Sequence, residues 1–139
     1  MVRILGIDPG EKRIGVAITD PLGITAQGLE VITFTNQDEA LEKIEQICLD
    51  YDVDKIVVGN PLNMNGTRGP AAEKALLFAE QLRQILDLPV IMVDERLSTV
   101  SAEKTLISGG VNRNKRRDLR DKLAAALILE AYLSKLDND

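Results

Sequence analysis

Two spacings of hydrophobic residues occur along the chain, and together they predict an α/β fold. Apolar runs over 2–8, 13–19 and 27–34 are typical of strands, and turn-forming residues separate the first two runs. Apolar residues recur at helical spacing from the capping pair Asn36 and Glu39 to Tyr51, and again over 70–86 and 119–136. Shorter apolar runs predict two more strands at 55–58 and 90–93 and a short helix at 98–107.

The order of these elements predicts their topology. Three consecutive strands form an antiparallel meander, and the helix, strand, helix, strand, helix that follow require right-handed crossovers to two parallel strands. The expected product is a five-stranded mixed sheet flanked by helices. A length of 139 residues suits one domain, so we expect a single domain over 1–139.

Composition restricts the chemistry that the chain can perform. It contains no histidine, which excludes imidazole bases, the commonest zinc ligand and any triad that needs histidine. Its single cysteine, Cys48, lies on a predicted apolar helix face and is interpreted as a core residue in a reducing compartment. Neither an apolar run of membrane-spanning length nor a signal peptide is found, so we expect a cytoplasmic protein with no membrane partner.

The charge is unevenly distributed. The net charge is −5, yet basic residues gather between 112 and 122 against only two acids there. A basic segment within a polar linker at 109–117 predicts a mobile arm that contacts a nucleic-acid backbone; the alternative is a solvated linker.

Carboxylates follow the predicted strands where such sheets bind ligands. Asp8 ends the first strand, Asp94 and Glu95 end the fifth, and Asp121 lies on the sheet-facing stripe of the last helix. Each has a structural alternative. Asp8 can stabilise a turn, and the pair at 94–95 can stabilise the start of a helix.

An acid on the buried stripe needs a compensating charge. For Asp121 this is either a metal ion or a basic neighbour such as Arg120 or Lys122. Asp118, one turn earlier, is a second candidate for the same role but lies nearer the polar linker. Three carboxylates without histidine suit Mg²⁺ or Mn²⁺. Two such ions, about 4 Å apart, can activate water and stabilise the leaving oxygen in phosphoryl transfer.

Four sequence blocks carry a family resemblance. They are IDPGEKRIGVAITD at 7–20, GNPLNMNGT at 59–67, VDERLST at 93–99 and DKLAAALILEAYL at 121–133. In this order they resemble the bacterial YqgF family, also called RuvX, whose members are described as Holliday junction resolvases or as nucleases that mature the small-subunit ribosomal RNA precursor. The resemblance implies a ribonuclease-H-like fold. It also implies a nuclease acting on structured RNA or branched DNA.

The resemblance places the family's catalytic acids at Asp8, Glu95 and Asp121, as the metal ligands. One departure is that the fourth strand ends in Gly59, Asn60 and Pro61, where many ribonuclease-H-like nucleases carry a carboxylate. The residues expected to contact nucleic acid are Arg13, Asn60, Asn65, Arg68, Arg96, Arg113, Lys115, Arg116 and Arg117. For the loop at 60–68 the alternative is simple turn formation.

Several readings stay open at this stage. A nucleotide-binding module of the actin and sugar-kinase kind shares the fold but needs a second lobe, and a non-catalytic binding factor could keep the fold without hydrolysis. A resolvase needs two active sites and so a homodimer, whereas an RNA-processing enzyme can act as a monomer. We favour 5′-end processing of the 16S rRNA precursor. Whether cleavage is endo- or exonucleolytic is not determined by the sequence.

Overall fold

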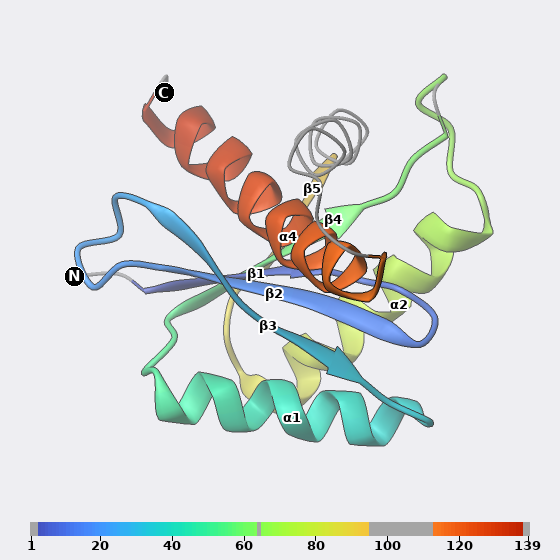
Figure 1. The fold of residues 1–139 in the computed structure, drawn as a ribbon, viewed down its shortest axis with the longest axis horizontal. Helices are drawn as coiled ribbons and strands as arrows, with labels where there is room; N and C mark the ends of the chain where they lie inside the picture. Colours follow the sequence, from blue (N-terminus) through green and yellow to red (C-terminus); the bar gives the residue numbers. More distant parts are fainter. Residues whose placement is uncertain (1–2, 64, 95–112, 138–139) are drawn as a thin grey trace.

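The computed structural model describes residues 3–63, 65–94 and 113–137 and contains one mixed sheet with helices on both faces (Figure 1). The strands are β1 (Ile4–Asp8), β2 (Arg13–Thr19), β3 (Ala26–Thr33), β4 (Lys55–Asn60) and β5 (Val90–Asp94). The helices are α1 (Gln37–Asp50), α2 (Pro70–Leu86) and α4 (Arg113–Asp137). The helix predicted at 98–107 lies outside the described residues.

The sheet has the predicted topology. Its order is β3-β2-β1-β4-β5, with β1 and β3 antiparallel to β2 and with β4 parallel to both β1 and β5. Helix α4 crosses one face, and α1 and α2 lie on the other (Figure 1). This confirms the fold class. No helix in the described part of the chain combines the length and hydropathy needed to cross a membrane.

Strand residues alternate between two hydrophobic clusters, one on each face of the sheet. On β4, Ile56 and Val58 belong to the cluster under α1 and α2, whereas Val57 belongs to the cluster under α4. All three are fully buried, which is why β4 is continuously apolar. Burial of one such side chain stabilises the fold by roughly 1.5–3 kcal/mol. The alternation also determines the face on which each strand-end side chain lies.

Glycines let α4 approach the sheet closely. A Cβ added at Gly6 would lie 3.0 Å from the carbonyl oxygen of Ala125, and one added at Gly15 would lie 2.1 Å from that of Asp121. A Cβ added at Gly28, on β3, would likewise lie 2.9 Å from the Cβ of Lys122. These three strand positions therefore seat the helix, and Gly15 tolerates no side chain without movement of α4.

The first two helices begin as their sequences predict. Asn36 caps α1, because its side-chain oxygen accepts a hydrogen bond from the backbone N–H of Glu39 at 2.9 Å. Pro70 occupies the first turn of α2, where its missing N–H removes no helical hydrogen bond.

The predicted polar linker at 109–117 is wrong from residue 113 onward. Helix α4 begins at Arg113 and runs 25 residues to Asp137, so the basic segment is helical instead of a mobile arm. The physical reason is that arginine and lysine are good helix formers and no glycine or proline interrupts 113–137. Charge alone did not distinguish a solvated helical turn from a loop.

Candidate active site

Three parallel strands deliver polar residues to one edge of the sheet. Asp8 ends β1, Asn60 ends β4 and Asp94 ends β5. The register pairs Ile7 with Val58 and Asn60 with Asp94, so the three ends lie side by side. Ligands of open α/β sheets bind at the carboxyl ends of the strands. This edge is therefore the expected location of a functional site.

Asp8 lies on the same face of the sheet as α4. It is paired with Gly15 across the β1–β2 ladder, and directly opposed residues project from the same face with Cβ atoms about 5 Å apart. The Cβ position of Gly15 points at α4 and would lie 3.3 Å from the Cβ of Asp121. Asp8 and Asp121 are therefore near neighbours, which is the convergence expected from the sequence.

Asp94 belongs to the opposite side of the sheet by strand alternation. Val93 packs with the cluster under α4, and Met92 packs against the other cluster. Continuing the alternation places Asp94 on the side of α2, away from Asp8. Glu95, the other acid predicted at this strand end, lies outside the described residues.

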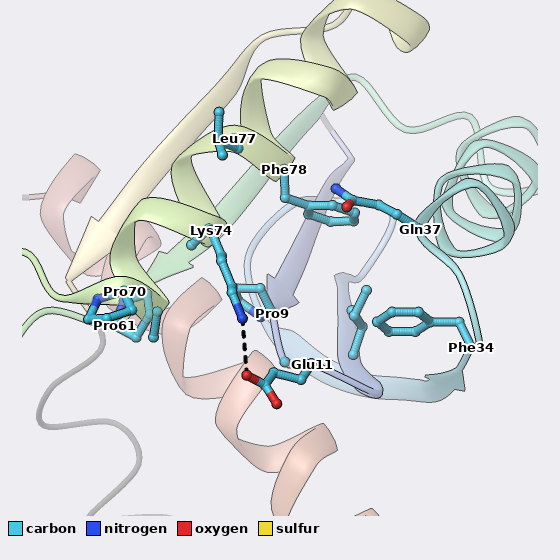
Figure 2. A pocket seen from close by; sticks show the side chains of 13 residues that line it. Pro9, Glu11, Phe34, Gln37, Pro61, Pro70, Lys74, Leu77 and Phe78 are labelled. Atoms are coloured by element: carbon cyan, nitrogen blue, oxygen red, sulfur yellow. Dashed lines mark hydrogen bonds and ion pairs between the residues drawn. The ribbon is translucent and has the colours of Figure 1, made fainter.

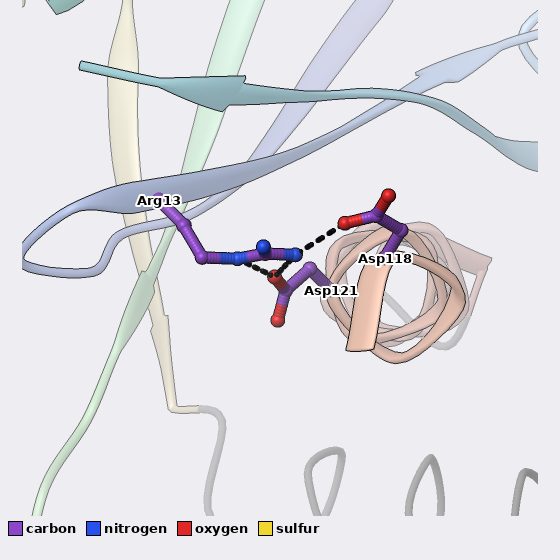
Figure 3. Close-up of polar contacts among 3 residues, drawn as sticks. All are labelled: Arg13, Asp118 and Asp121. Atoms are coloured by element: carbon purple, nitrogen blue, oxygen red, sulfur yellow. Dashed lines mark hydrogen bonds and ion pairs between the residues drawn. The ribbon is translucent and has the colours of Figure 1, made fainter. Parts of the chain in front are cut away.

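Arg13 joins the start of β2 to the first turns of α4 (Figure 3). Its Nε donates to Asp121 Oδ2 at 2.8 Å, and its Nη2 lies 2.7 Å from the same oxygen. The same Nη2 also donates to Asp118 Oδ1 at 2.6 Å. Burial alone would lower the pKa of Arg13, but these two acids reverse that effect and raise it above its ordinary value. The guanidinium therefore stays charged throughout the accessible pH range.

This pairing corrects one expectation. Asp121 is paired with Arg13, which lies 108 residues away in the sequence and was not among the partners that the sequence suggested. Adjacent residues on a helix project about 100° apart and do not face each other, so immediate sequence neighbours are poor partners. A residue on a facing strand is better placed.

The loop between β4 and α2 is organised by its own side chains. Asn65 Oδ1 accepts from the backbone N–H of Thr67 at 3.1 Å and from its hydroxyl at 2.6 Å, while Gly66 has a φ of 86°. Asn65 and Arg68 are exposed. Asn60 differs, since its side-chain oxygen is buried with no hydrogen-bond partner among the described residues. Asn65 therefore shapes this turn, and its contact with nucleic acid stays a prediction.

The remaining predicted contacts with nucleic acid lie on α4 or beyond the described chain. Arg116 is partly buried and Arg117 is exposed in the second turn of α4. Arg113 and Lys115 lie on the same helix, and Arg96 is outside the described residues. The helical turn that carries Arg116 and Arg117 directly precedes Asp118 and Asp121, so their positive charge is adjacent to the acidic cluster.

A pocket that the sequence did not predict opens on the opposite face of the sheet, beside the Pro9–Glu11 turn (Figure 2). It has a volume of about 780 Å³. Phe34 and Phe78 contribute apolar wall, and Lys74 Nζ meets Glu11 Oε1 at 3.1 Å. No local motif marks this pocket, because its walls come from four separate segments.

The chain matches a known protein family over nearly its whole length. The model of the family described as "RuvX: Holliday junction resolvase" matches residues 2–135. The chain belongs to the RuvX family. Relatives in this family include proteins of Desulforamulus reducens, 52% identical over 95% of this chain and 96% of theirs, and of Clostridium tetani, 50% identical over 99% of both. Both carry the name "Putative pre-16S rRNA nuclease".

Solved structures support the fold of this RuvX-family chain. T. thermophilus RuvC in complex with a Holliday junction substrate has a TM-score of 0.57 at 18% identity, covering 98% of this chain and 96% of that one. The fowlpox virus resolvase in complex with Holliday junction DNA has a TM-score of 0.56 at 14% identity, covering 97% and 99%. At these identities the similarity establishes the shared ribonuclease-H-like fold.

Proposed function

We propose that this RuvX-family chain is a metal-dependent nuclease that hydrolyses phosphodiester bonds in the 5′-end processing of the 16S rRNA precursor. The observation that carries the proposal is the approach of Asp121 to Asp8 across Gly15, at the carboxyl edge of a ribonuclease-H-like sheet. Relatives 50–52% identical carry the name of a pre-16S rRNA nuclease. Such an enzyme would act in the cytoplasm, where this RNA is made.

The residues that would hold Mg²⁺ or Mn²⁺ are Asp8, Glu95 and Asp121. Within residues 3–63, 65–94 and 113–137, no three acids form a metal-binding group; Asp8 and Asp121 lie in these ranges, and Glu95 lies outside them. These two fit, because carboxylates suit hard cations and the place already holds the cation of Arg13. When bound, a pair of such ions supplies an activated water and stabilises the leaving oxygen.

The chain's own residues have separate tasks in this proposal. Asp8 and Asp121 concentrate negative charge on one face of the sheet, and packing of α4 on Gly15 fixes their separation. Asp118 holds Arg13 at 2.6 Å, which supports a positioning role for it, and strand alternation argues against Asp94 as a ligand. Arg68, Arg96 and the arginines of α4 would contact phosphates, with sequence-independent affinity that falls as salt rises.

Cleavage of a four-way DNA junction is the second candidate activity. It is favoured by the family description, which names a Holliday junction resolvase. Two strands must be cut symmetrically in that reaction, so this activity requires a homodimer with both sites facing one junction. RNA processing is compatible with a monomer. Oligomeric state therefore separates the two activities as well as the substrate does.

The experiment compares cleavage of a labelled precursor rRNA fragment and a labelled DNA junction by the wild type and Asp8→Asn, with Mg²⁺ or Mn²⁺. Asp38→Asn is the matched control, because Asp38 is an exposed acid in the first turn of α1, on the other face of the sheet. We expect metal-dependent cutting of the RNA that is lost only in Asp8→Asn. Cleavage by Asp8→Asn at the wild-type rate would refute the site. A wild type that cuts neither substrate, with or without metal, would favour a binding factor.

A further inference from the structure

Two nitrogen atoms of Arg13 contact the same carboxylate oxygen of Asp121. Nε and Nη2 both lie within 2.8 Å of Asp121 Oδ2, while Nη2 also reaches Asp118 Oδ1. The contact is partly withdrawn from water, since the side chains of Arg13 and Asp121 are 24% and 20% exposed. Asp118 is more open, at 58%. The three residues thus form an ion-pair clamp that is more buried at Asp121 than at Asp118 (Figure 3).

Arg13 supplies the positive charge that the neighbouring carboxylates need when no metal is bound. Asp118 and Asp121 bring two carboxylates to Arg13, and a partly buried carboxylate is costly without a nearby cation. Arg13 supplies a permanent positive charge, because a guanidinium stays protonated at every accessible pH. A divalent cation bound to Asp121 would have to share or take the oxygen to which Arg13 donates. A guanidinium and a metal ion cannot both approach one carboxylate oxygen closely without strong repulsion.

We propose that Arg13 is the resident counter-ion of the metal site, so that metal and Arg13 compete for Asp121, and Asp118 retains the guanidinium once Asp121 is released. This rests on the proposed function, because it takes Asp121 as a metal ligand. It gives Arg13 a regulatory role: the guanidinium lowers metal affinity and stabilises the metal-free protein. It also gives Asp118 a distinct role from Asp121, although the two acids lie one helical turn apart.

Once Asp121 binds metal, Arg13 keeps one bond to Asp118 and its remaining N–H groups are available to an oxygen ligand. A phosphate oxygen is the acceptor that the fork of an arginine fits best. Metal loading would thereby present Arg13 to the substrate backbone at the edge where Asp8 lies. The exchange predicts that metal and nucleic acid bind cooperatively, with each favouring the released position of Arg13.

The test measures Mn²⁺ binding to the purified, metal-free full chain by calorimetry, without nucleic acid. Arg13→Gln should bind Mn²⁺ about tenfold more tightly than the wild type, a change equivalent to about 1.4 kcal/mol. With chelator present, the same variant should melt at a lower temperature than the wild type, because the acids have lost their counter-ion. Its metal-dependent gain in melting temperature should therefore be larger.

Two further variants separate competition from a general effect of charge. Arg13→Lys keeps the charge but loses the fork, so it should also bind Mn²⁺ more tightly; it serves equally if Arg13→Gln does not fold. Lys122→Gln removes one positive charge from the same helix without removing a bond to Asp121, so it should change affinity little. Equal tightening by Lys122→Gln and Arg13→Gln, with no effect of Arg13→Lys, would overturn the competition.

The outcomes also distinguish this inference from the proposed function. Mn²⁺ binding that disappears in Asp121→Asn but is unchanged or weakened in Arg13→Gln would overturn the counter-ion role alone. Binding that is the same in Asp8→Asn, Asp121→Asn and the wild type would overturn the metal site and this inference together. In the wild type, the Arg13 Nε–H resonance should shift on addition of Mg²⁺. A resonance that stays fixed while Mg²⁺ binds at Asp121 would contradict release.

Discussion

Substitution of Gly15 by alanine would separate the two acids of the candidate site without changing either of them. The added Cβ would lie 2.1 Å from the carbonyl oxygen of Asp121, whereas real Cβ atoms essentially never come closer than 3.0 Å to such an atom. The strand and the helix must therefore move apart by at least about 0.9 Å, and the obstacle is backbone, which cannot rotate away as a side chain can.

The expected loss of stability combines two opposing effects. Overpacking of this kind costs roughly 1–3 kcal/mol. Replacing glycine by alanine also restricts the unfolded chain, which stabilises by about 0.4–1 kcal/mol. The net loss is about 1–2 kcal/mol, which for a domain of this size lowers the melting temperature by about 5 °C. A displacement of about 1 Å near the reacting groups can reduce the rate by about 100-fold.

The assay pairs thermal unfolding with cleavage of the precursor rRNA fragment, and Gly28→Ala is the matched control. Gly28 faces the same helix, but its nearest contact is the Cβ of Lys122 at 2.9 Å, with the backbone oxygen at 3.5 Å. The added Cβ falls short of the 3.0 Å limit by about 0.1 Å at Gly28 and by about 0.9 Å at Gly15, so we expect Gly28→Ala to lose less stability and less cleavage activity than Gly15→Ala. Wild-type stability and activity in Gly15→Ala would refute the close seating of α4, and equal losses in both variants would show that Gly15 has no special role.

Three further outcomes test separate parts of the structure. Asp20→Asn should lower stability at neutral pH, because backbone hydrogen bonds from Thr25, Ile24 and Leu22 lower the pKa of Asp20 below 3.8. The stability that the wild type gains from these bonds is complete above pH 3.8. Denaturant titrations should show this gain vanish as the pH falls through the pKa of Asp20 in the folded protein. Cys48 should resist alkylation at pH 8 in the folded protein and react after unfolding, since burial raises its pKa to about 11; rapid labelling of the native thiol would contradict this. Arg117→Ala should reduce the salt dependence of RNA binding by about one counterion, and an unchanged slope in filter-binding assays would remove Arg117 from the interface.

The sheet could be predicted because each strand is recognised from residues that are consecutive in the sequence. Continuous apolar runs at 55–58 and 90–93 belong to strands buried on both faces, and the order of elements leaves few topologies. Asp8 and Asp121 were predicted as neighbours because one ends a central strand and the other lies on the stripe of α4 that packs on the sheet. The structure places Asp121 against Gly15, which is the ladder partner of Asp8.

What the sequence did not show depends on contacts between distant segments. Arg13 was expected to contact phosphate, and its bonds with Asp118 and Asp121 span 105 and 108 residues. No periodicity encodes such a pair. The start of α4 was misplaced for a related reason: a cluster of like charges resembles a solvated loop, and the ion pair with β2 that fastens this end of the helix is visible only in three dimensions.

The separation of Arg13 from its two aspartates also has a consequence for biosynthesis. The β1–β2 hairpin leaves the ribosome before α4, which is the last helix of the described chain to emerge, and domains fold as their segments become available. Arg13 cannot meet Asp118 and Asp121 until nearly all of the 139 residues have been made. A growing chain thus carries Asp8 and Arg13 before either acidic partner of Arg13 exists. The ion pair between β2 and α4 therefore forms only when synthesis of the domain is nearly finished.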